Sequence, residues 1–233
     1  ILRDVEETKA ELTATDTSPC GIVTLGASAT SSRLLYARLA EAAYKQYPHI
    51  DLNMTEGASY FLLEGLDTGR IDIAVMVDPE PQAYFDTEPL VTEKVYLVSG
   101  AGQADSPPPS CSVKDLKHRP LVLFSRPSGS RALLESTAAS SGISLNVRFE
   151  AASPDVIKDF VRRGLGYGVM PYSSIFADIT QGELVATEME GVELTRTLIQ
   201  RTDRTESPAI NAIADLVREE FTGLRQEGVF GSS

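Results

Sequence analysis

Cysteine, histidine and the usual catalytic motifs are scarce in this sequence. Its 233 residues hold two cysteines, Cys20 and Cys111, and two histidines, His49 and His118, which stand in loop-like settings without a partnered nucleophile. Gly-x-Ser-x-Gly, Walker, His-Glu-x-x-His and Cys-x-x-Cys patterns are absent. We therefore predict no catalytic residue, no metal ion and no cofactor. Two cysteines suit reduced thiols in the cytoplasm, with a single disulfide bridge as the alternative.

Positive charge is also in short supply. The 21 Lys and Arg against 33 Asp and Glu give a formal net charge of −12. Binding to nucleic acid phosphates or anionic lipids depends on Lys and Arg, so the chain is not expected to bind either by itself. No apolar run approaches the ~20 residues that cross a bilayer, and no secretory leader opens the chain. A hydrophobic content of 42% indicates a soluble globular protein with one large domain or two small lobes.

The first residues differ in pattern from the rest of the chain. Residues 1–12 show a short, imperfect amphipathic helix pattern, and residues 13–19 break it with small polar side chains and a proline. The chain begins at Ile1 and not at a methionine, so we expect it to be a fragment of a longer protein. A separate globular body is predicted to start near Gly21.

That body alternates strand and helix patterns twice. The first series comprises a strand over 21–26, a helix ended by Tyr47 and Pro48, a strand over 50–55, a helix over 59–68 stopped by Gly69, and a strand over 71–77. The second comprises a strand over 120–124, a helix over 131–140 stopped by Gly142, a strand over 145–150, a helix over 155–163, and a strand leading to a turn at Met170 and Pro171.

Two extended strands and a last helix complete the pattern. The strands cover 93–99 and 193–201, and the helix starts at Ser207-Pro208 with an apolar stripe that runs from Ile210 to Leu224. This order predicts an α/β fold of two Rossmann-like subdomains joined by two crossover strands. Such a fold has a cleft, and ligands bind where the carboxyl ends of parallel strands meet helix N-termini.

Several short motifs, in this order and spacing, resemble one known family. They are Tyr47-Pro48, Thr55-Glu56-Gly57, Gly69-Arg70-Ile71-Asp72-Ile73-Ala74, Glu88-Pro89-Leu90, Tyr96-Leu97-Val98, Gly164-Leu165-Gly166 and Met170-Pro171. Over residues 20–225 the chain resembles the effector-binding domain of LysR-type transcriptional regulators. Within that family, Ser31 to Leu35, Thr55 to Gly57 and Ser125 to Arg131 look most like the nitrogen-assimilation-control members.

The resemblance implies a domain organisation and partners. Residues 1–19 would be the end of a linker helix, 20–95 with 196–233 the first regulatory subdomain and 96–195 the second, in a fold like that of type 2 periplasmic binding proteins. The winged helix-turn-helix DNA-binding domain would be absent from this chain, and DNA would be bound only through it. The implied partners are a small-molecule effector in the cleft between the lobes, a second copy in a homodimer or homotetramer, and RNA polymerase.

Hydroxyl side chains in the first lobe are the first candidate ligand contacts. Ser28, Thr30 and Ser31 follow a predicted strand at a helix N-terminus, and no acidic residue lies between Gly21 and Ala40. Unpaired N–H groups and the helix dipole favour an anion at such a point. The alternative is that these hydroxyls only cap the helix. The resemblance adds an effector contact at Ser59, which could equally be the N-cap of its own helix.

The second lobe supplies a similar polar loop. Ser125, Arg126 and Ser128 lie in it, and either Arg126 or Arg131 could hold a carboxylate through two hydrogen bonds. Arg131 stands four residues before Glu135, which favours a solvated ion pair, so the serines are preferred. Glycines 164, 166 and 168 favour a tight turn over a nucleotide site. Met170 either lines the cleft or belongs to the core.

Two other classes of protein share the predicted architecture. One is a solute-binding protein of a transport system, and the other is a two-lobed enzyme that acts on a small acid. We predict the regulator, because the charged N-terminal helix pattern has no purpose in the first and a catalytic base is missing for the second. In a regulator, the effector must bind one conformation better than the other, by ~1–3 kcal/mol for ordinary allosteric coupling.

Overall fold

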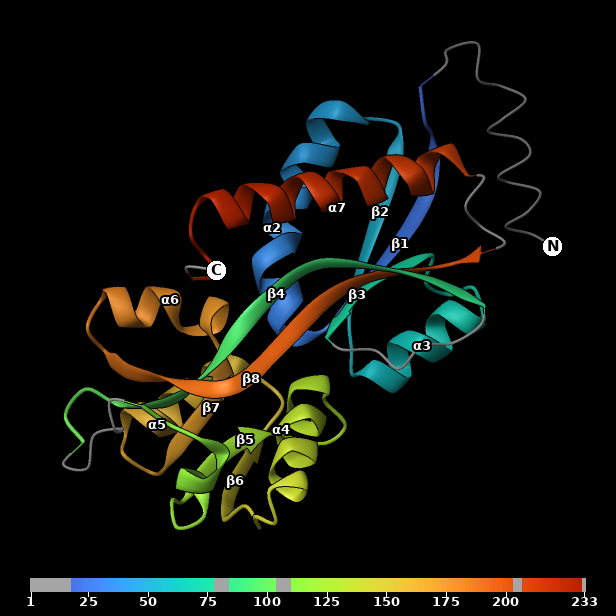
Figure 1. Ribbon diagram of the computed structural model, residues 1–233. Helices are drawn as coiled ribbons and strands as arrows, with labels where there is room; N and C mark the ends of the chain where they lie inside the picture. Colours follow the sequence, from blue (N-terminus) through green and yellow to red (C-terminus); the bar gives the residue numbers. More distant parts are fainter. Residues whose placement is uncertain (1–17, 78–83, 104–109, 203–206, 232–233) are drawn as a thin grey trace. The chain divides into compact units, whose positions relative to one another are not determined.

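The computed structural model describes residues 18–77, 84–103, 110–202 and 207–231 (Figure 1). The helix predicted over residues 1–12 lies outside this range. The described elements are β1 (Gly21–Ala27), α2 (Ala29–Gln46), β2 (Ile50–Glu56), α3 (Ser59–Asp67), β3 (Ile73–Val77), β4 (Phe85–Gly100), the short 3-10 helix η1 (Val113–Leu116), β5 (Leu121–Phe124), α4 (Gly129–Ser140), β6 (Val147–Ala151), α5 (Pro154–Arg162), β7 (Tyr167–Pro171), α6 (Tyr172–Thr180), β8 (Leu184–Arg201) and α7 (Pro208–Gln226).

The described strands are hydrogen-bonded in the order β2-β1-β3-β8-β4-β7-β5-β6, and the chain divides into two compact units. Among the described residues, unit 1 holds 18–76, 84–90, 197–202 and 207–223, and unit 2 holds Val77, 91–103, 110–196 and 224–231. Strands β4 and β8 contribute residues to both units. The sequence-based boundaries place residues 77, 91–95, 196 and 224–231 in the first lobe, whereas the structure groups these residues with unit 2.

Unit 1 is built on three parallel strands. Strand β1 pairs with β2 from Gly21 opposite Ile50 to Ala27 opposite Glu56, and with β3 on its other side. The predicted strand-helix-strand unit is confirmed, with boundaries within one residue for β1 and β2. All five residues of β3 are buried, as expected for a strand covered on both faces.

Helices cover the unit 1 sheet through apolar stripes. Helix α2 buries Leu35, Leu39 and Ala43, and it lies beside α7, where Arg38 Nε donates to Glu220 Oε2 at 2.8 Å (Figure 1). Helix α3 packs with β3 and β8 in a separate apolar cluster, and it ends before Gly69, whose φ of 70° is a conformation that glycine adopts without strain. The predicted α7 stripe is buried at all five positions: Ile210, Ile213, Val217, Phe221 and Leu224.

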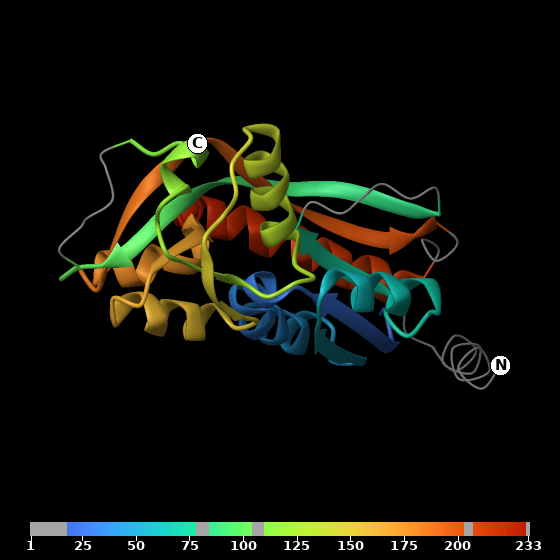
Figure 2. The same cartoon turned by 90° about the horizontal axis from the view of Figure 1, so that it is seen from below.

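Unit 2 has helices on both sides of its strands. Strand β5 is parallel to β6 and β7, and β7 is antiparallel to β4. One apolar cluster includes Leu134 and Ala138 of α4, and the other includes Ile157 and Val161 of α5 with Ile175 of α6. Figure 2 accordingly shows α4 and α5 on opposite sides of these strands. The unit is a three-layer sandwich.

Two features of the described elements differ from the prediction. Met170 and Pro171 were expected to lead into a turn, but helix α6 starts directly after Pro171, which occupies its N-cap position. The strands β4 and β8 are also longer than predicted, starting at Phe85 and Leu184. Their outer halves alternate exposed and buried residues irregularly, so the period-2 signal is weak there.

A buried ion pair joins the long strands of unit 2 to α6. The side chains of Glu93 in β4 and Arg196 in β8 are both 0% exposed, and Arg196 donates to Glu93 Oε1 through Nη2 at 2.7 Å and Nε at 2.8 Å. The Ser173 amide, in the first turn of α6, donates to Glu93 Oε2 at 2.9 Å, and Arg196 Nη2 donates to Ser173 Oγ at 3.0 Å. The carboxylate therefore stabilises a helix N-terminus and neutralises a buried cation at once.

We predict that Arg196→Met lowers the free energy of unfolding by about 3–5 kcal/mol, because it leaves the Glu93 carboxylate buried without its cation. Urea unfolding followed by circular dichroism measures this change. The control is Lys94→Gln, which removes a cation from the half-exposed pair with Glu188 at 2.6 Å and should cost no more than about 1 kcal/mol. Equal losses in the two variants would contradict the special role of the buried pair.

Candidate functional site

The first candidate loop lies at the carboxyl edge of the unit 1 strands. Because Ala27 is opposite Glu56 in the β1–β2 register, Ser28 and Gly57 continue from neighbouring strand ends, and the Gly57 amide donates to the Ala27 carbonyl at 3.1 Å. Ser28 is the N-cap of α2, but its hydroxyl makes no capping bond and pairs instead with the Ser31 hydroxyl at 3.0 Å. The Ser28 side chain therefore does not cap helix α2.

The other hydroxyls of this loop differ in accessibility. Thr30 and Ser31 are buried, with 6% and 0% exposure, whereas Ser28 and Ser59 are half-buried. Ser59 is the first residue of α3, and the N-cap position belongs to Ala58, so the predicted capping alternative for Ser59 is wrong. Ser28 and Ser59 therefore have solvent-accessible surface that a ligand can contact, whereas Thr30 and Ser31 are packed inside the first turn of α2.

A carboxylate that the sequence reading missed reaches the same helix start. Ser32 Oγ donates to Glu56 Oε2 at 2.5 Å and to the Ala29 carbonyl at 3.1 Å. The local sequence of α2 has no acid in its first turn, but β2 brings one from a neighbouring strand. The signal was present in the strand pairing, since Glu56 ends β2 opposite the last residue of β1.

Tyr36 of α2 lies close to the Glu56 carboxylate. Its hydroxyl donates to the Thr55 carbonyl at 2.5 Å, and burial, followed by the charge of Glu56, raises the pKa of Tyr36 far above its ordinary value. The hydroxyl therefore stays protonated and keeps the end of β2 against α2.

The second candidate loop precedes α4 in unit 2. The Ser125 amide donates to the Ala151 carbonyl at 3.0 Å, and Ser128 is the N-cap of α4 without a side-chain capping bond. Both serines are half-buried. Gly129 begins the helix, and a Cβ atom there would clash with the Val77 carbonyl oxygen, so the close backbone approach requires glycine.

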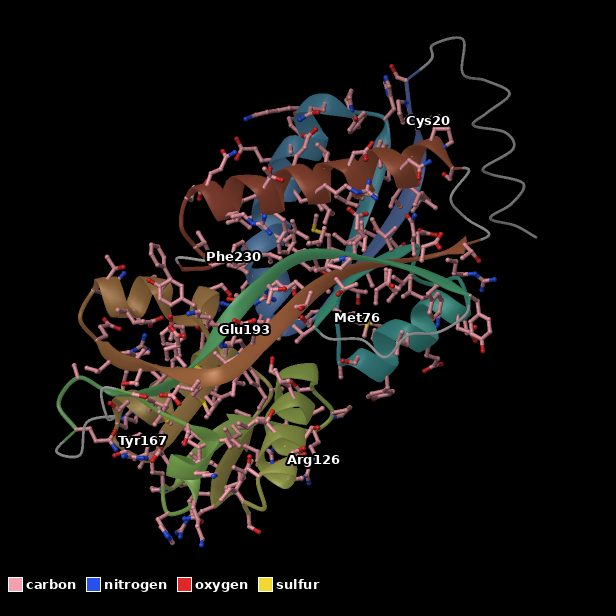
Figure 3. All side chains as sticks on the ribbon, in the orientation of Figure 1. Cys20, Met76, Arg126, Tyr167, Glu193 and Phe230 are labelled. Carbon is pink, nitrogen blue, oxygen red and sulfur yellow. The ribbon has the colours of Figure 1, made fainter. Side chains whose placement is uncertain are left out.

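Arg126, labelled in Figure 3, is exposed, and its guanidinium forms an ion pair with a carboxylate. Its Nε and Nη2 donate to the two oxygens of Glu135 at 3.0 and 2.5 Å. This hydrogen bond is the largest cause that lowers the pKa of Glu135, and burial opposes it. Arg126 therefore has the geometry expected for carboxylate binding, with a residue of its own chain as the partner.

Arg131 has a different environment from the one predicted. Its ion pair with Glu135 is present at 2.7 Å, but the Arg131 side chain is 3% exposed and not solvated. It also donates to the Phe124 carbonyl at 2.9 Å and to Glu150 Oε1 at 3.1 Å. These acceptors lie at the ends of β5, β6 and along α4, so Arg131 holds the loop in place and has no free surface for a ligand.

Acidic residues mark which helix N-termini of unit 2 can attract an anion. Helix α5 has Asp155 in its first turn, and α6 receives the Glu93 carboxylate at Ser173. Helix α4 has no acidic residue in its first turn. In unit 1, the first turns of α2 and α3 also lack acids. Among the described helices, those without an acidic residue in the first turn include α2 and α3 at the first candidate loop and α4 at the second.

The remaining candidates are structural in this fold. Gly164, with φ of 70°, follows the end of α5, which confirms a tight turn over a nucleotide site. Met170 is 0% exposed in the apolar cluster of α5 and α6, so its predicted place in the ligand-contacting wall is not supported by its position. Its alternative, a core methionine, describes it better.

The described ranges contain neither a candidate metal centre nor a membrane-spanning helix. No group of three or more His, Cys, Asp or Glu there could hold a metal ion, and no described helix is long and apolar enough to cross a membrane. Both cysteines are free thiols, which excludes the bridge between Cys20 and Cys111 in this structure.

The fold and these loops define a class of two-unit α/β ligand-binding domains. The family model of the LysR substrate binding domain matches residues 16–222, so the chain belongs to this family. BbuR of Bordetella bronchiseptica, named as an HTH-type transcriptional regulator, is 27% identical over 98% of this chain and 71% of its own length. The chain spans about two thirds of the length of the curated relatives that it matches.

Solved structures agree on the fold. A mutant of OxyR from Corynebacterium glutamicum has a TM-score of 0.78 at 18% identity, covering 97% of this chain and 72% of that one. The CcmR regulatory domain of Synechocystis in complex with 2-PG has a TM-score of 0.77 at 14% identity, covering 85% and 96%.

The chain is thus the effector-binding domain of a LysR-type regulator. The names of its relatives confirm the prediction of a transcriptional regulator and not an enzyme, and the transport alternative is set aside with it. The predicted α/β fold of this family is confirmed as well. LysR-type regulators bind small effectors and DNA and form oligomers.

The two thiols should react at very different rates. Cys20 is half-buried at the start of unit 1, whereas Cys111 is 0% exposed, and burial raises the pKa of Cys111 to about 11. We predict that iodoacetamide alkylates Cys111 on the order of 100-fold more slowly than Cys20 in the native protein. Mass spectrometry of timed samples measures both rates, and unfolding in urea should make them similar. Equal rates in the native protein would contradict the burial of Cys111.

Proposed function

We propose that this domain senses a small anionic effector through its two hydroxyl-rich loops, the first at Ser28, Thr30, Ser31 and Ser59 and the second at Ser125, Arg126 and Ser128. The observation that carries the proposal is the start of α2. This helix of 18 residues begins at the edge of a parallel sheet with two half-buried or buried serine hydroxyls paired to each other and no acid in its first turn. Its dipole favours negative charge there.

The second loop supports the same ligand chemistry. Helix α4 lacks an acid in its first turn, and Arg126 beside it has the side-on, two-bond geometry that a carboxylate prefers. The CcmR regulatory domain, similar in fold, was solved with 2-PG, which supports a small organic effector for this fold. That one effector contacts both loops stays a prediction from the sequence.

The rest of the regulator follows from the family. We infer that the full protein carries a winged helix-turn-helix domain before this chain, binds DNA only through it, acts in the cytoplasm, and assembles as a homodimer or homotetramer that contacts RNA polymerase. The net charge of −12 supports the assignment of DNA binding to another domain. The likeness of Ser31 to Leu35 and Thr55 to Gly57 to nitrogen-assimilation-control regulators stays a narrower prediction.

The Glu56 carboxylate limits what the first loop can bind. It accepts a hydrogen bond from Ser32 within the first turn of α2, so it opposes a second negative charge at that helix start. An effector there must either tolerate this charge or offer Glu56 a hydroxyl or ammonium donor. A simple anion should bind weakly for the same reason.

Malonate tests the proposed anion site. At a concentration ten times its dissociation constant, it should stabilise the parent chain by about 1.4 kcal/mol, or roughly 3–5 °C in Tm. In Ser59→Asp we predict the loss of most of this shift, because a carboxylate in the first turn repels the anion while it stabilises α3 itself. Differential scanning fluorimetry measures both effects.

The matched control for this experiment is Ser136→Asp, which adds the same charge at an exposed position in the middle of α4. It should leave the malonate shift intact. The proposed site is wrong if Ser59→Asp, folded and with the parent Tm in the absence of malonate or above it, keeps the full shift.

Neutralising Glu56 should have the opposite effect. We predict that Glu56→Gln raises the affinity for malonate several-fold, because a charge next to the α2 start is removed while the Ser32 hydroxyl keeps an oxygen acceptor. Titration followed by NMR of the backbone amides at Ala29 to Ser32 gives the dissociation constants. Lower affinity in this variant would show that Glu56 does not oppose the anion.

A further inference from the structure

The Arg126 guanidinium is occupied by a residue of its own chain. Both oxygens of Glu135 accept hydrogen bonds from it, at 2.5 Å from Nη2 and at 3.0 Å from Nε. This is the arrangement in which an arginine binds a planar carboxylate from a ligand. Arg126, in the loop that the proposed function assigns to the effector, therefore forms a complete pair with a carboxylate of its own chain.

The pair is open to solution on the arginine side. The Arg126 side chain is 67% exposed and the Glu135 side chain 29%. Exposed ion pairs contribute little to stability because water screens both charges. A dissolved carboxylate can therefore compete with Glu135 for Arg126 without unfolding the loop, and Glu135 has the advantage of being held at the site by its own chain.

Arg131 holds the Glu135 carboxylate in position, so that it stays close to Arg126. Its Oε1 accepts from Arg131 Nε at 2.7 Å, and the buried Arg131 is itself held by the Phe124 carbonyl and by Glu150 Oε1. Arg131 keeps these two acceptors when Glu135 loses its charge. The contact of Glu135 with Arg126 is therefore separable from the packing of the loop.

We propose that Glu135 is an internal competitor of the effector carboxylate: it occupies the Arg126 fork, and it sets the affinity and selectivity of the second loop by how readily it gives way. This inference rests on the proposed function for the carboxylate class of ligand. It adds a residue that binds no effector itself and determines which effectors bind, since a ligand must form a better pair with Arg126 than Glu135 does.

The test uses the 233-residue chain and malonate as the probe. We expect Glu135→Gln to bind malonate about two- to fivefold more tightly than the parent, the factor that corresponds to the usual strength of an exposed ion pair. Amide chemical shifts of Arg126 and Ser128 to Arg131 should follow the titration. Arg126→Gln combined with Glu135→Gln should lose the gain, because the fork itself is then missing.

The matched control is Glu150→Gln. Glu150 contacts the same Arg131 at 3.1 Å but forms no hydrogen bond with Arg126, so this variant removes an equal charge without freeing the fork. Its malonate affinity should stay closer to that of the parent. Equal gains in the two single variants, or a gain that persists in the double variant, would overturn the proposal.

The same titration separates this inference from the proposed function. If Glu135→Gln shows no gain while amides at Ala29 to Ser32 still respond to malonate, the competitor proposal fails and the anion site at α2 stands. If neither set of amides responds in any variant, both fail together. Circular dichroism of each variant confirms that a null result comes from folded protein.

Discussion

The buried Glu93–Arg196 pair is the interaction on which unit 2 depends most. Both side chains are fully buried. They form an ion pair with each other, and each also forms a hydrogen bond with Ser173. Such a pair gives little net stability over an apolar pair of the same size, but removing one partner is costly. Its effect is to fix which residues of β4 and β8 face each other and where α6 begins.

The placement of carboxylates explains which loops remain available to an anion. In unit 2, Glu93 and Asp155 lie at the starts of α6 and α5 and satisfy the positive ends of these helices. The first turn of α4 contains no acidic residue, and neither does that of α2 in unit 1, where the nearby carboxylate is Glu56 of β2, bound to Ser32. A protein with a net charge of −12 thus leaves negative charge out of the first turns of the helices that follow its two candidate loops.

Local pattern predicted much of the fold and little of the site's electrostatics. The hydrophobic periodicity of β1, α2 and β2 is a property of short segments, and so are the helix ends at Gly69 and Gly142. The bounds of these elements were predicted to within a few residues. Helix α6 was missed because its start is stabilised by Glu93, 80 residues away. The role of Glu56 and the burial of Arg131 were missed for the same reason, since each depends on strands that meet only in the folded chain.

The two internal carboxylates give the candidate loops a common character. Glu56 accepts a hydrogen bond at the start of α2, and Glu135 binds both donors of the Arg126 guanidinium, so each proposed loop already contains a negative charge. In the proposed function, each carboxylate is expected to lower the affinity for simple anions. A lower affinity for simple anions does not harm a sensor. A ligand changes a conformational equilibrium only by the difference between its affinities for the two states, so tight binding to both states changes nothing. Weak, selective binding is therefore the expected property of loops built in this way.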